Sequence, residues 1–521
     1  MFCFVSIGSV FSRRKMKLAG ALGFLLLAFS VLAGVDDDKP GATNSQVAAE
    51  DKAPGPPSEA ATGFNNTTNG FEPQDAFDKD RQKFEEVEAI SDGLGPVYNA
   101  TSCVSCHQNP VSGSSSQVAE LRAGHHEPNP DDPKKVIFIE PPGGSLVHQR
   151  AIDAAIQEHV LPEDEVHTLR MSTSILGGGF VEVIPDADIL KTRAAQPKGM
   201  KGLAVAVPVV VTGKQGAGGD FEFVFVERIG RFGWKCQEAS LVNFSAGAYL
   251  NEMGITNPLN PKENLSNGRD VSQFDLVPDP EDKVDPKESD NQEHPFGDDV
   301  KAFTRFLRST KAPPRDFSLA GTRDVQEGEK LFRNNETLGC AICHHPDFTT
   351  PKAGTPIQAL YSKDKSPPGS DLGTVPQALG DKIIHPYSDF MLHDMGTGDG
   401  IAQTQHAQRP ARGTENLRKA PEEALNREGV ARVQARPRPG ARRMLSAQPG
   451  LDQRTINMIR TAPLWGLRVR PQLLHDGSAL TIDEAIRKHK GQAEEVTQKY
   501  LKLVADHPEQ ARELIAFLNS L

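Results

Sequence analysis

Cysteine is scarce outside two short motifs, and this scarcity excludes a fold stapled by disulfides. The 521 residues contain six cysteines. Four of them belong to two C-x-x-C-H motifs, and the other two are Cys3 and Cys236. A disulfide scaffold is usually a short chain in which many cysteines are available for pairing. The chain therefore belongs to another class of protein.

Basic charge and aromatic side chains are also in short supply. The net charge is −11, from 58 Lys and Arg against 69 Asp and Glu, so no nucleic-acid-binding surface is expected. Aromatic residues make up 6% of the chain and hydrophobic residues 37%. This hydrophobic content is low for a compact globular protein. Long polar segments, or a large apolar cofactor that adds to the core, would explain the low value.

The longest apolar run spans residues 18–32, which is short for a membrane span of about 20 residues. It follows the basic sequence Arg-Arg-Lys-Met-Lys and ends in small residues, as an export signal does. We expect a signal peptide over residues 1–33 and a periplasmic or otherwise exported chain with no membrane span after cleavage. An uncleaved N-terminal anchor is the alternative, and Met16 is an alternative start.

Two C-x-x-C-H motifs, at 103–107 and 340–344, indicate covalent attachment of haem. In this order, two cysteines on a short turn each form a thioether with a haem vinyl group, and the histidine binds the iron. We therefore expect two haem c groups, held by Cys103, Cys106 and His107 and by Cys340, Cys343 and His344.

A zinc site built from C-x-x-C pairs and a disulfide within each pair are the alternatives to haem. Zinc sites of this type space their pairs by roughly 12–20 residues, whereas these pairs lie about 240 residues apart. Neither alternative requires a histidine after each pair. The repeated histidine therefore favours haem.

A similar pattern precedes each motif. Residues 75–90 and 328–332 carry apolar side chains at helical spacing among charged ones, which predicts amphipathic helices that lead into the motifs. Strand-like runs at 136–140, 205–212 and 221–226 predict short ribbons on a helical body. The chain thus repeats one unit, an amphipathic helix followed by a glycine turn and C-x-x-C-H.

Long polar segments separate these parts. Residues 34–73 are rich in Asp, Pro, Ala, Gly and Asn, which predicts a disordered tether. The Ala-Pro-Pro sequence at 312–314 indicates a hinge between two halves. Residues 402–455 are rich in Gln, Arg, Pro and Ala and are predicted to form a solvated insertion, with an anionic partner for the arginines as the alternative.

Five blocks of the chain resemble the bacterial di-haem oxidoreductases, relatives of the di-haem cytochrome c peroxidases and of the di-haem enzyme of methylamine utilisation. The blocks are residues 95–107, 230–256, 339–344, 387–396 and 461–477. The resemblance implies a mainly α fold: two cytochrome c-like haem domains with short β ribbons and long polar loops. The N-terminal domain would span 74–311 and the C-terminal domain 312–521, with the insertion inside it.

The resemblance also implies an activity. Such proteins reduce hydrogen peroxide at one haem, here the one on His107, with electrons passed from the other, here the one on His344. The donor would be a small protein such as a cytochrome c or a cupredoxin. Oxidation of a protein or organic substrate by high-valent iron and electron carriage without catalysis are the alternatives. Relatives often hold Ca²⁺ between the domains, although no calcium-loop spacing is present here.

Two residues in the resembling blocks match catalytic positions of the family. Glu252 falls where the peroxidases place a distal acid, a carboxylate that moves a proton between the peroxide oxygens. Trp234 matches the tryptophan between the two haems. The alternatives are a solvent-facing helix glutamate and an ordinary core tryptophan.

The remaining expectations concern the second axial ligand of each iron. His125 or His126 lies where a displaceable distal ligand of the first haem is expected. His489 stands where relatives with a His/Met haem carry the methionine, so a bis-histidine haem of lower potential is expected at the second site. Met395 is the alternative ligand there.

Overall fold

The computed structural model describes residues 56–216, 219–288, 292–360, 372–396, 398–403, 430–432 and 451–521. The predicted signal peptide, residues 34–55 of the predicted tether and most of the predicted insertion lie outside the described residues. Contacts join Pro56–Leu521 into one unit, and the domain boundary expected near residue 312 stays a prediction. No described helix has the length and apolar character that a membrane crossing requires.

The first C-x-x-C-H motif lies beside three packed helices. Helix α1 (Gln74–Glu85) contacts α6 (Asp298–Ser309), and α4 (Leu241–Met253) packs against α6 as well. The Phe84 and Phe306 rings are 4.8 Å apart at their centroids. Ser240 caps α4, and Gly254, at φ 73°, ends it where a Cβ would lie 2.7 Å from the carbonyl oxygen of Gly95. These contacts fix the helix that carries Glu252.

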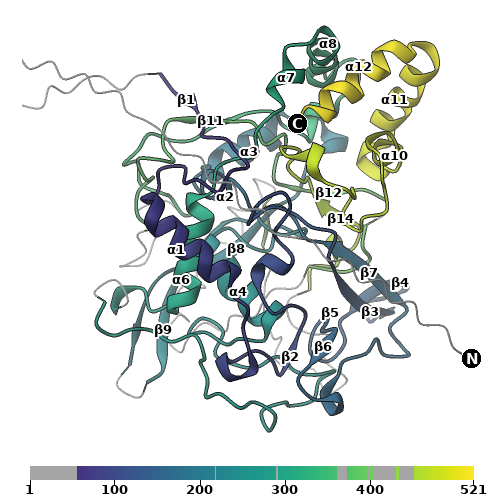
Figure 1. Ribbon diagram of the computed structural model, residues 1–521. Coiled ribbons are helices and arrows are strands. Elements are labelled where there is room, and N and C mark those ends of the chain that lie inside the picture. Colours follow the sequence, from purple (N-terminus) through teal and green to yellow (C-terminus); the bar gives the residue numbers. More distant parts are fainter. Residues whose placement is uncertain are drawn as a thin grey trace, which may run out of the picture. The chain divides into compact units, whose positions relative to one another are not determined.

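The second motif lies beside a C-terminal group of helices, at the top of Figure 1. Helix α8 (Arg323–Arg333) packs on α12 (Pro508–Asn519) so closely that a Cβ on Gly328 would lie 2.0 Å from the carbonyl oxygen of Glu513. The other helices here are α7 (Phe317–Ala320), α10 (Ile482–Arg487) and α11 (Glu494–Asp506). Both predicted approach helices are confirmed, and each leads to a 3₁₀ turn that holds the cysteines, η2 (Cys103–Ser105) and η5 (Cys340–Ile342).

The prediction of a mainly α fold is wrong. The structure is 31% helical and 20% strand, and the strands of the described residues form five sheets. Strand β8 (Ala204–Gln215) pairs antiparallel with β9 (Phe221–Ile229) and parallel with β13 (Val430–Arg432). Strand β3 (Ala119–Asn129) pairs with β4 (Asp132–Ile139), β5 (Leu146–Val147) and β7 (Val166–Met171). Side-chain pairing across long ribbons therefore supports a large part of the fold.

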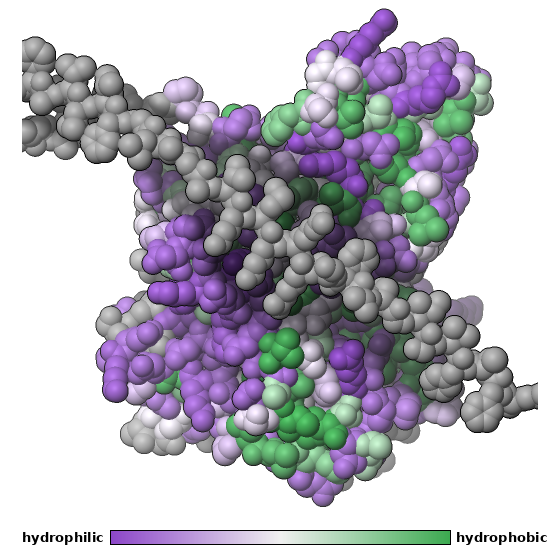
Figure 2. All heavy atoms as spheres, in the orientation of Figure 1, coloured by the Kyte–Doolittle hydropathy of each residue, from purple (hydrophilic) through white to green (hydrophobic). Residues whose placement is uncertain are grey.

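Short strands and helices complete the fold. Three small sheets join distant parts of the chain. One has three strands, in the order β1 (Ser58–Glu59), β11 (Lys382–Ile384) and β10 (Phe348–Thr349). The others are the pairs β2 (Val97–Tyr98) with β6 (Arg150–Ala151) and β12 (Leu392–Asp394) with β14 (Met458–Arg460). Helices α2 (Gly178–Glu182) and α3 (Asp186–Ala195) lie in the central core. Figure 2 shows a mostly hydrophilic face, with apolar side chains gathered over the C-terminal helices and in a patch at the lower end of this view.

Candidate functional site

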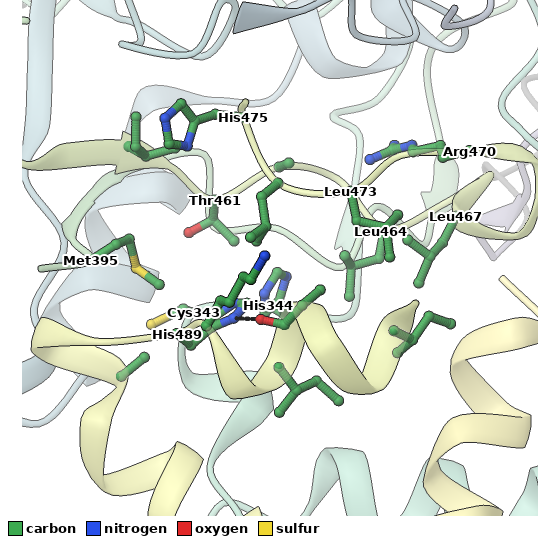
Figure 3. A pocket seen from close by; sticks show the side chains of 18 of the residues that line it. Cys343, His344, Met395, Thr461, Leu464, Leu467, Arg470, Leu473, His475 and His489 are labelled. Atoms are coloured by element: carbon green, nitrogen blue, oxygen red, sulfur yellow. Dashed lines mark hydrogen bonds between the residues drawn. The ribbon is translucent and has the colours of Figure 1, made fainter. Parts of the chain in front are cut away.

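The larger of two neighbouring cavities opens at the second motif. Its volume is about 540 Å³, within the range of about 300–1,000 Å³ that is usual for cofactor sites. Cys340, Cys343 and His344 form part of its wall, and His489 lies just beyond α10. Figure 3 shows His344 and His489 together, with Met395 to one side and leucines to the other. The lining is therefore largely apolar, with the metal-binding groups at one wall.

The imidazoles of His344 and His489 have ring centroids 6.4 Å apart. The Nδ1 atom of His344 donates a hydrogen bond to the carbonyl oxygen of Tyr387 (3.1 Å), and that of His489 donates to Ala485 (2.7 Å). Each ring therefore keeps Nε2 available as a ligand, which is the usual orientation of metal-binding histidines. Two metal–nitrogen bonds of about 2.0–2.1 Å and the two ring radii add to about 6 Å. One metal ion fits between the rings.

Both rings are held in the neutral form that binds metal. Burial and, to a smaller extent, the neighbouring His489 lower the pKa of His344 to about 4. Burial also lowers the pKa of His489. Neutral imidazole is the ligand form. This wall of the cavity therefore needs no deprotonation to accept an iron.

The smaller cavity, about 230 Å³, opens at the first motif. Cys103, Cys106 and His107 line it, and the His107 Nδ1 atom lies 3.3 Å from the carbonyl oxygen of Ser114. Burial lowers the pKa of His107, so this ring too is neutral. Among the described lining residues His107 is the one histidine, and no second imidazole faces it. This volume is below the range of about 300–1,000 Å³ that is usual for cofactor sites.

Three glutamates, Glu120, Glu238 and Glu252, line this smaller cavity. Glu252 comes from α4 and Glu120 from β3. Asn99 donates a hydrogen bond to Glu252 Oε2 (3.0 Å), and Arg122 donates to Glu120 Oε1 (2.9 Å). Burial and, to a smaller extent, the Glu120 carboxylate raise the pKa of Glu252 to about 8. Burial opposes ionisation of Glu120 as well, but Arg122 and Arg170 outweigh it and lower the pKa of Glu120.

The structure does not bring His125 or His126 to this cavity. Both lie further along β3, and neither is among the lining residues. The Nδ1 atom of His125 is 3.0 Å from Asp164 Oδ1, and that of His126 is 3.0 Å from Glu165 Oε1. The acidic partners occupy one nitrogen of each ring and hold both rings away from His107. Ligation of the first haem by His125 or His126 stays a prediction from the sequence, and the structure places neither ring at this cavity.

Trp234 borders both cavities, as do Met171, Ser172 and Thr173. The Trp234 Nε1–H donates a hydrogen bond to the carbonyl oxygen of Met171 (2.8 Å), and its ring is 6.2 Å from that of His475. The indole is thus a shared wall between the two motifs. The role of Trp234 between two haems stays a prediction.

A buried ion network lies directly behind this wall. Asp399 Oδ1 is 2.8 Å from Lys235 Nζ, and Asp399 Oδ2 is 2.7 Å from Arg170 Nη2. Burial opposes ionisation of Asp399, but the two cations outweigh it and lower its pKa to about 2. Burial lowers the pKa of Lys235 to about 8. The network anchors the backbone of Trp234 from three separate parts of the chain.

Sequence reasoning missed Glu120, Arg122, Arg170 and Asp399. Residues 108–135 were predicted to form a polar connection interrupted by glycine and proline. A signal was present in the alternation Ala-Glu-Leu-Arg-Ala at 119–123, which has the period of a strand and places Glu120 and Arg122 on one face. Arg170 and Asp399 carry no comparable pattern.

Four carboxylates gather in the polar connection after α4. Glu263, Asp275, Asp279 and Glu281 each offer an oxygen within 4.8 Å of the others. Neither carboxylate oxygen of Glu263 has a hydrogen-bond partner, although both are buried. Burial and the three neighbouring carboxylates raise the pKa of Glu263 to about 10. Oxygen-rich clusters of this kind suit Ca²⁺, so these residues fit the ion that the resemblance implies.

Comparison with known proteins identifies one family. The family described as "Di-haem oxidoreductase, putative peroxidase" matches residues 147–417. A solved structure of hydrazine synthase from Kuenenia stuttgartiensis is similar at 12% sequence identity, with 93% of this chain and 100% of that chain covered and a TM-score of 0.30. No curated protein matches.

Proposed function

Because the chain belongs to the di-haem oxidoreductase family, we propose that it is an exported enzyme that carries two covalent haem c groups and reduces hydrogen peroxide. The electrons would come from a small donor protein such as a cytochrome c or a cupredoxin. One observation carries the proposal: two cavities, each with its own C-x-x-C-H motif, share Trp234 as a wall. A pair of cofactors held this way is suited to passing electrons from one to the other.

The residues of each site fit a haem. Cys103 and Cys106, or Cys340 and Cys343, would form the thioethers, and His107 or His344 would bind the iron. When bound, haem supplies one-electron redox chemistry and a metal face for peroxide. The protein supplies the neutral imidazoles, the apolar lining that excludes water and the acid–base groups beside His107.

The two sites differ in what faces the motif histidine. His489 faces His344, and this supports a closed second site that only transfers electrons. Glu120, Arg122 and Glu252 line the first site, where no second imidazole is present among the described lining residues. This supports an open first site that takes peroxide, with the two sites in the roles that the resemblance implies.

The proposal is tested on protein matured in a host with haem-attachment machinery. We expect two haems per chain that survive denaturing electrophoresis, one six-coordinate and one able to bind an added ligand by electron paramagnetic resonance. Replacing Cys103 and Cys106 with Ala should leave one covalent haem. Cys236→Ala is the matched control, because this buried cysteine lies outside both motifs, and it should keep two. A chain with no ligand-accepting iron and no peroxide reaction would refute the enzyme.

A second candidate function rests on the same His344–His489 pair. Bis-histidine ligation lowers a haem's potential, which makes a high-potential donor a poor match. We infer oxidation of a protein or an organic substrate by peroxide as the alternative. Peroxide-dependent substrate oxidation without consumption of a reduced donor cytochrome would favour it over peroxide reduction.

We also propose that Ca²⁺ binds at Glu263, Asp275, Asp279 and Glu281. Thr256, three residues after Met253 of α4, donates a backbone N–H hydrogen bond of 2.7 Å to Glu281 Oε2. The site therefore lies against the end of the helix that carries Glu252. Its expected role is to hold this end of α4 in place.

A further inference from the structure

Glu120 and Glu252 meet in the first cavity although they are far apart in the sequence. Their carboxyl groups line the same buried cavity, and the charge of Glu120 adds to burial in raising the pKa of Glu252. Two carboxyl groups that face each other in a buried site do not both ionise, because the like charges repel. The two glutamates therefore hold one proton between them at neutral pH.

The surroundings decide which of the two carries the proton. Glu120 accepts hydrogen bonds from Arg122 and lies opposite Arg170 in the β3–β7 pairing. Glu252 accepts its hydrogen bond from the neutral amide of Asn99. The cations favour ionised Glu120, and burial favours protonated Glu252. The other charged or titratable groups near the pair are Cys106, Glu140 and Arg150. His107, Glu238 and Tyr249 line the same cavity, where burial raises the pKa of Glu238 to about 8.

We propose that Glu120 and Glu252 form one proton-sharing catalytic pair, in which Glu120 is the base and Glu252 the acid for hydrogen peroxide. This inference rests on the proposed function. It adds a second carboxylate to the single distal acid expected from the sequence, and it assigns Arg122 as the positioning residue that keeps Glu120 ionised. A single carboxylate would have to release its own proton before it could act as the base.

The step balances without a net change in the pair. Glu120 takes the proton from one peroxide oxygen, and Glu252 gives its proton to the other as the O–O bond breaks, which releases water. The remaining oxygen is reduced to water by two electrons from the donor protein and two protons from solvent. The proton has then moved from Glu252 to Glu120, and its return restores the starting state.

The test is infrared spectroscopy of the oxidised holoprotein, with the carboxylic acid C=O band as readout. The wild-type protein should show a component of this band that is lost in Glu252→Gln. In Glu120→Gln the band should persist but ionise at lower pH, because the neighbouring negative charge is gone. Glu222→Gln removes an exposed carboxylate on β9 that is paired with Lys214, and as the matched control it should change nothing.

Peroxide kinetics complete the test. Glu120→Gln and Glu252→Gln should each slow the reaction with peroxide by about 10²–10⁴-fold, the usual contribution of a general acid or base. Glu252→Asp keeps a carboxyl group and should recover part of the rate, which separates lost chemistry from lost folding. Normal peroxide rates in Glu120→Gln would overturn the catalytic pair. A band that neither glutamine variant alters would overturn the shared proton. A wild-type protein with the expected band but no peroxide reaction would refute the proposed function and leave the pair as a proton-binding site.

Discussion

His344 and His489 face each other across the larger cavity at 6.4 Å between ring centroids, and each ring is oriented by a hydrogen bond from Nδ1 to a backbone carbonyl. The second ring is therefore set in place by the C-terminal helices and does not depend on a mobile loop. This arrangement leaves no room for an outside ligand once a metal lies between the rings. It makes the second site suitable for electron transfer.

Replacing His489 with Met should raise the midpoint potential of one haem. A thioether stabilises the reduced iron relative to imidazole, so His/Met haems have higher potentials than bis-histidine haems. A spectroelectrochemical titration measures the change. His507→Met is the matched control, because His507 is an exposed histidine in the same C-terminal block. Equal potentials in the wild-type and His489→Met proteins would rule out His489 as a ligand.

Replacing Trp234 with Phe should slow electron transfer between the haems by about tenfold, a barrier change of about 1.4 kcal/mol. The smaller ring leaves a gap in the shared wall and loses the hydrogen bond to Met171. Pulse-reduction kinetics on the half-reduced protein measure the rate. Trp465→Phe alters the only other tryptophan, which lies in a core cluster, and should leave the rate unchanged. Equal slowing in both variants would indicate a general loss of packing.

Replacing Asp399 with Asn should lower the free energy of unfolding by about 3–5 kcal/mol, because two buried cations lose their partner. The wild-type protein should itself lose about 2–3 kcal/mol in acid. The folded pKa of Asp399 is about 2, below the usual value of about 3.9, so this contribution is complete above about pH 4 and is lost as the pH falls towards 2. Urea unfolding at several pH values measures both effects. An acid loss of the same size in Asp399→Asn would assign it to other carboxylates.

Removing Ca²⁺ with a chelator should lower the melting temperature, and added Ca²⁺ should restore it. An ion present at 100 times its dissociation constant stabilises a protein by about 2.7 kcal/mol. Glu263→Gln should weaken this response because it removes a buried ligand. Asp270→Asn is the control, since Asp270 is an exposed acid in the same connection. A melting temperature that does not respond to Ca²⁺ in the wild-type protein would remove the proposed site.

The sequence predicted the local elements that follow from periodicity. The helices before each motif and the strands at 205–212 and 221–226 have clear apolar spacing, and they form. The three-dimensional structure brings Trp234 to both cavities and Glu252 to the first, while the catalytic roles of both residues stay predictions. These predictions depended on short-range sequence patterns and on short motifs that resemble those of the family.

Strand β3 shows why the rest could not be predicted. The alternation at 119–123 stops after Ala123, because the rest of the strand, Gly-His-His-Glu-Pro-Asn, has no large apolar side chain that would mark a half-buried strand. Adjacent residues of a strand point to opposite faces, so His125 and His126 cannot both serve one site. His126 lies four residues beyond Arg122, about 13 Å along the strand. An extended conformation thus carries the histidines away from the cavity to which Glu120 contributes.

Met171 links the two cavities through its backbone. Its N–H donates to the carbonyl oxygen of His475 at 2.7 Å, and its own carbonyl receives the Trp234 indole N–H. A porphyrin bound in one cavity therefore restricts the motion of the Met171 backbone, which also lines the other cavity. Maturation of the two halves is then expected to be cooperative, so a chain with one motif removed should load its remaining porphyrin more slowly than the intact chain.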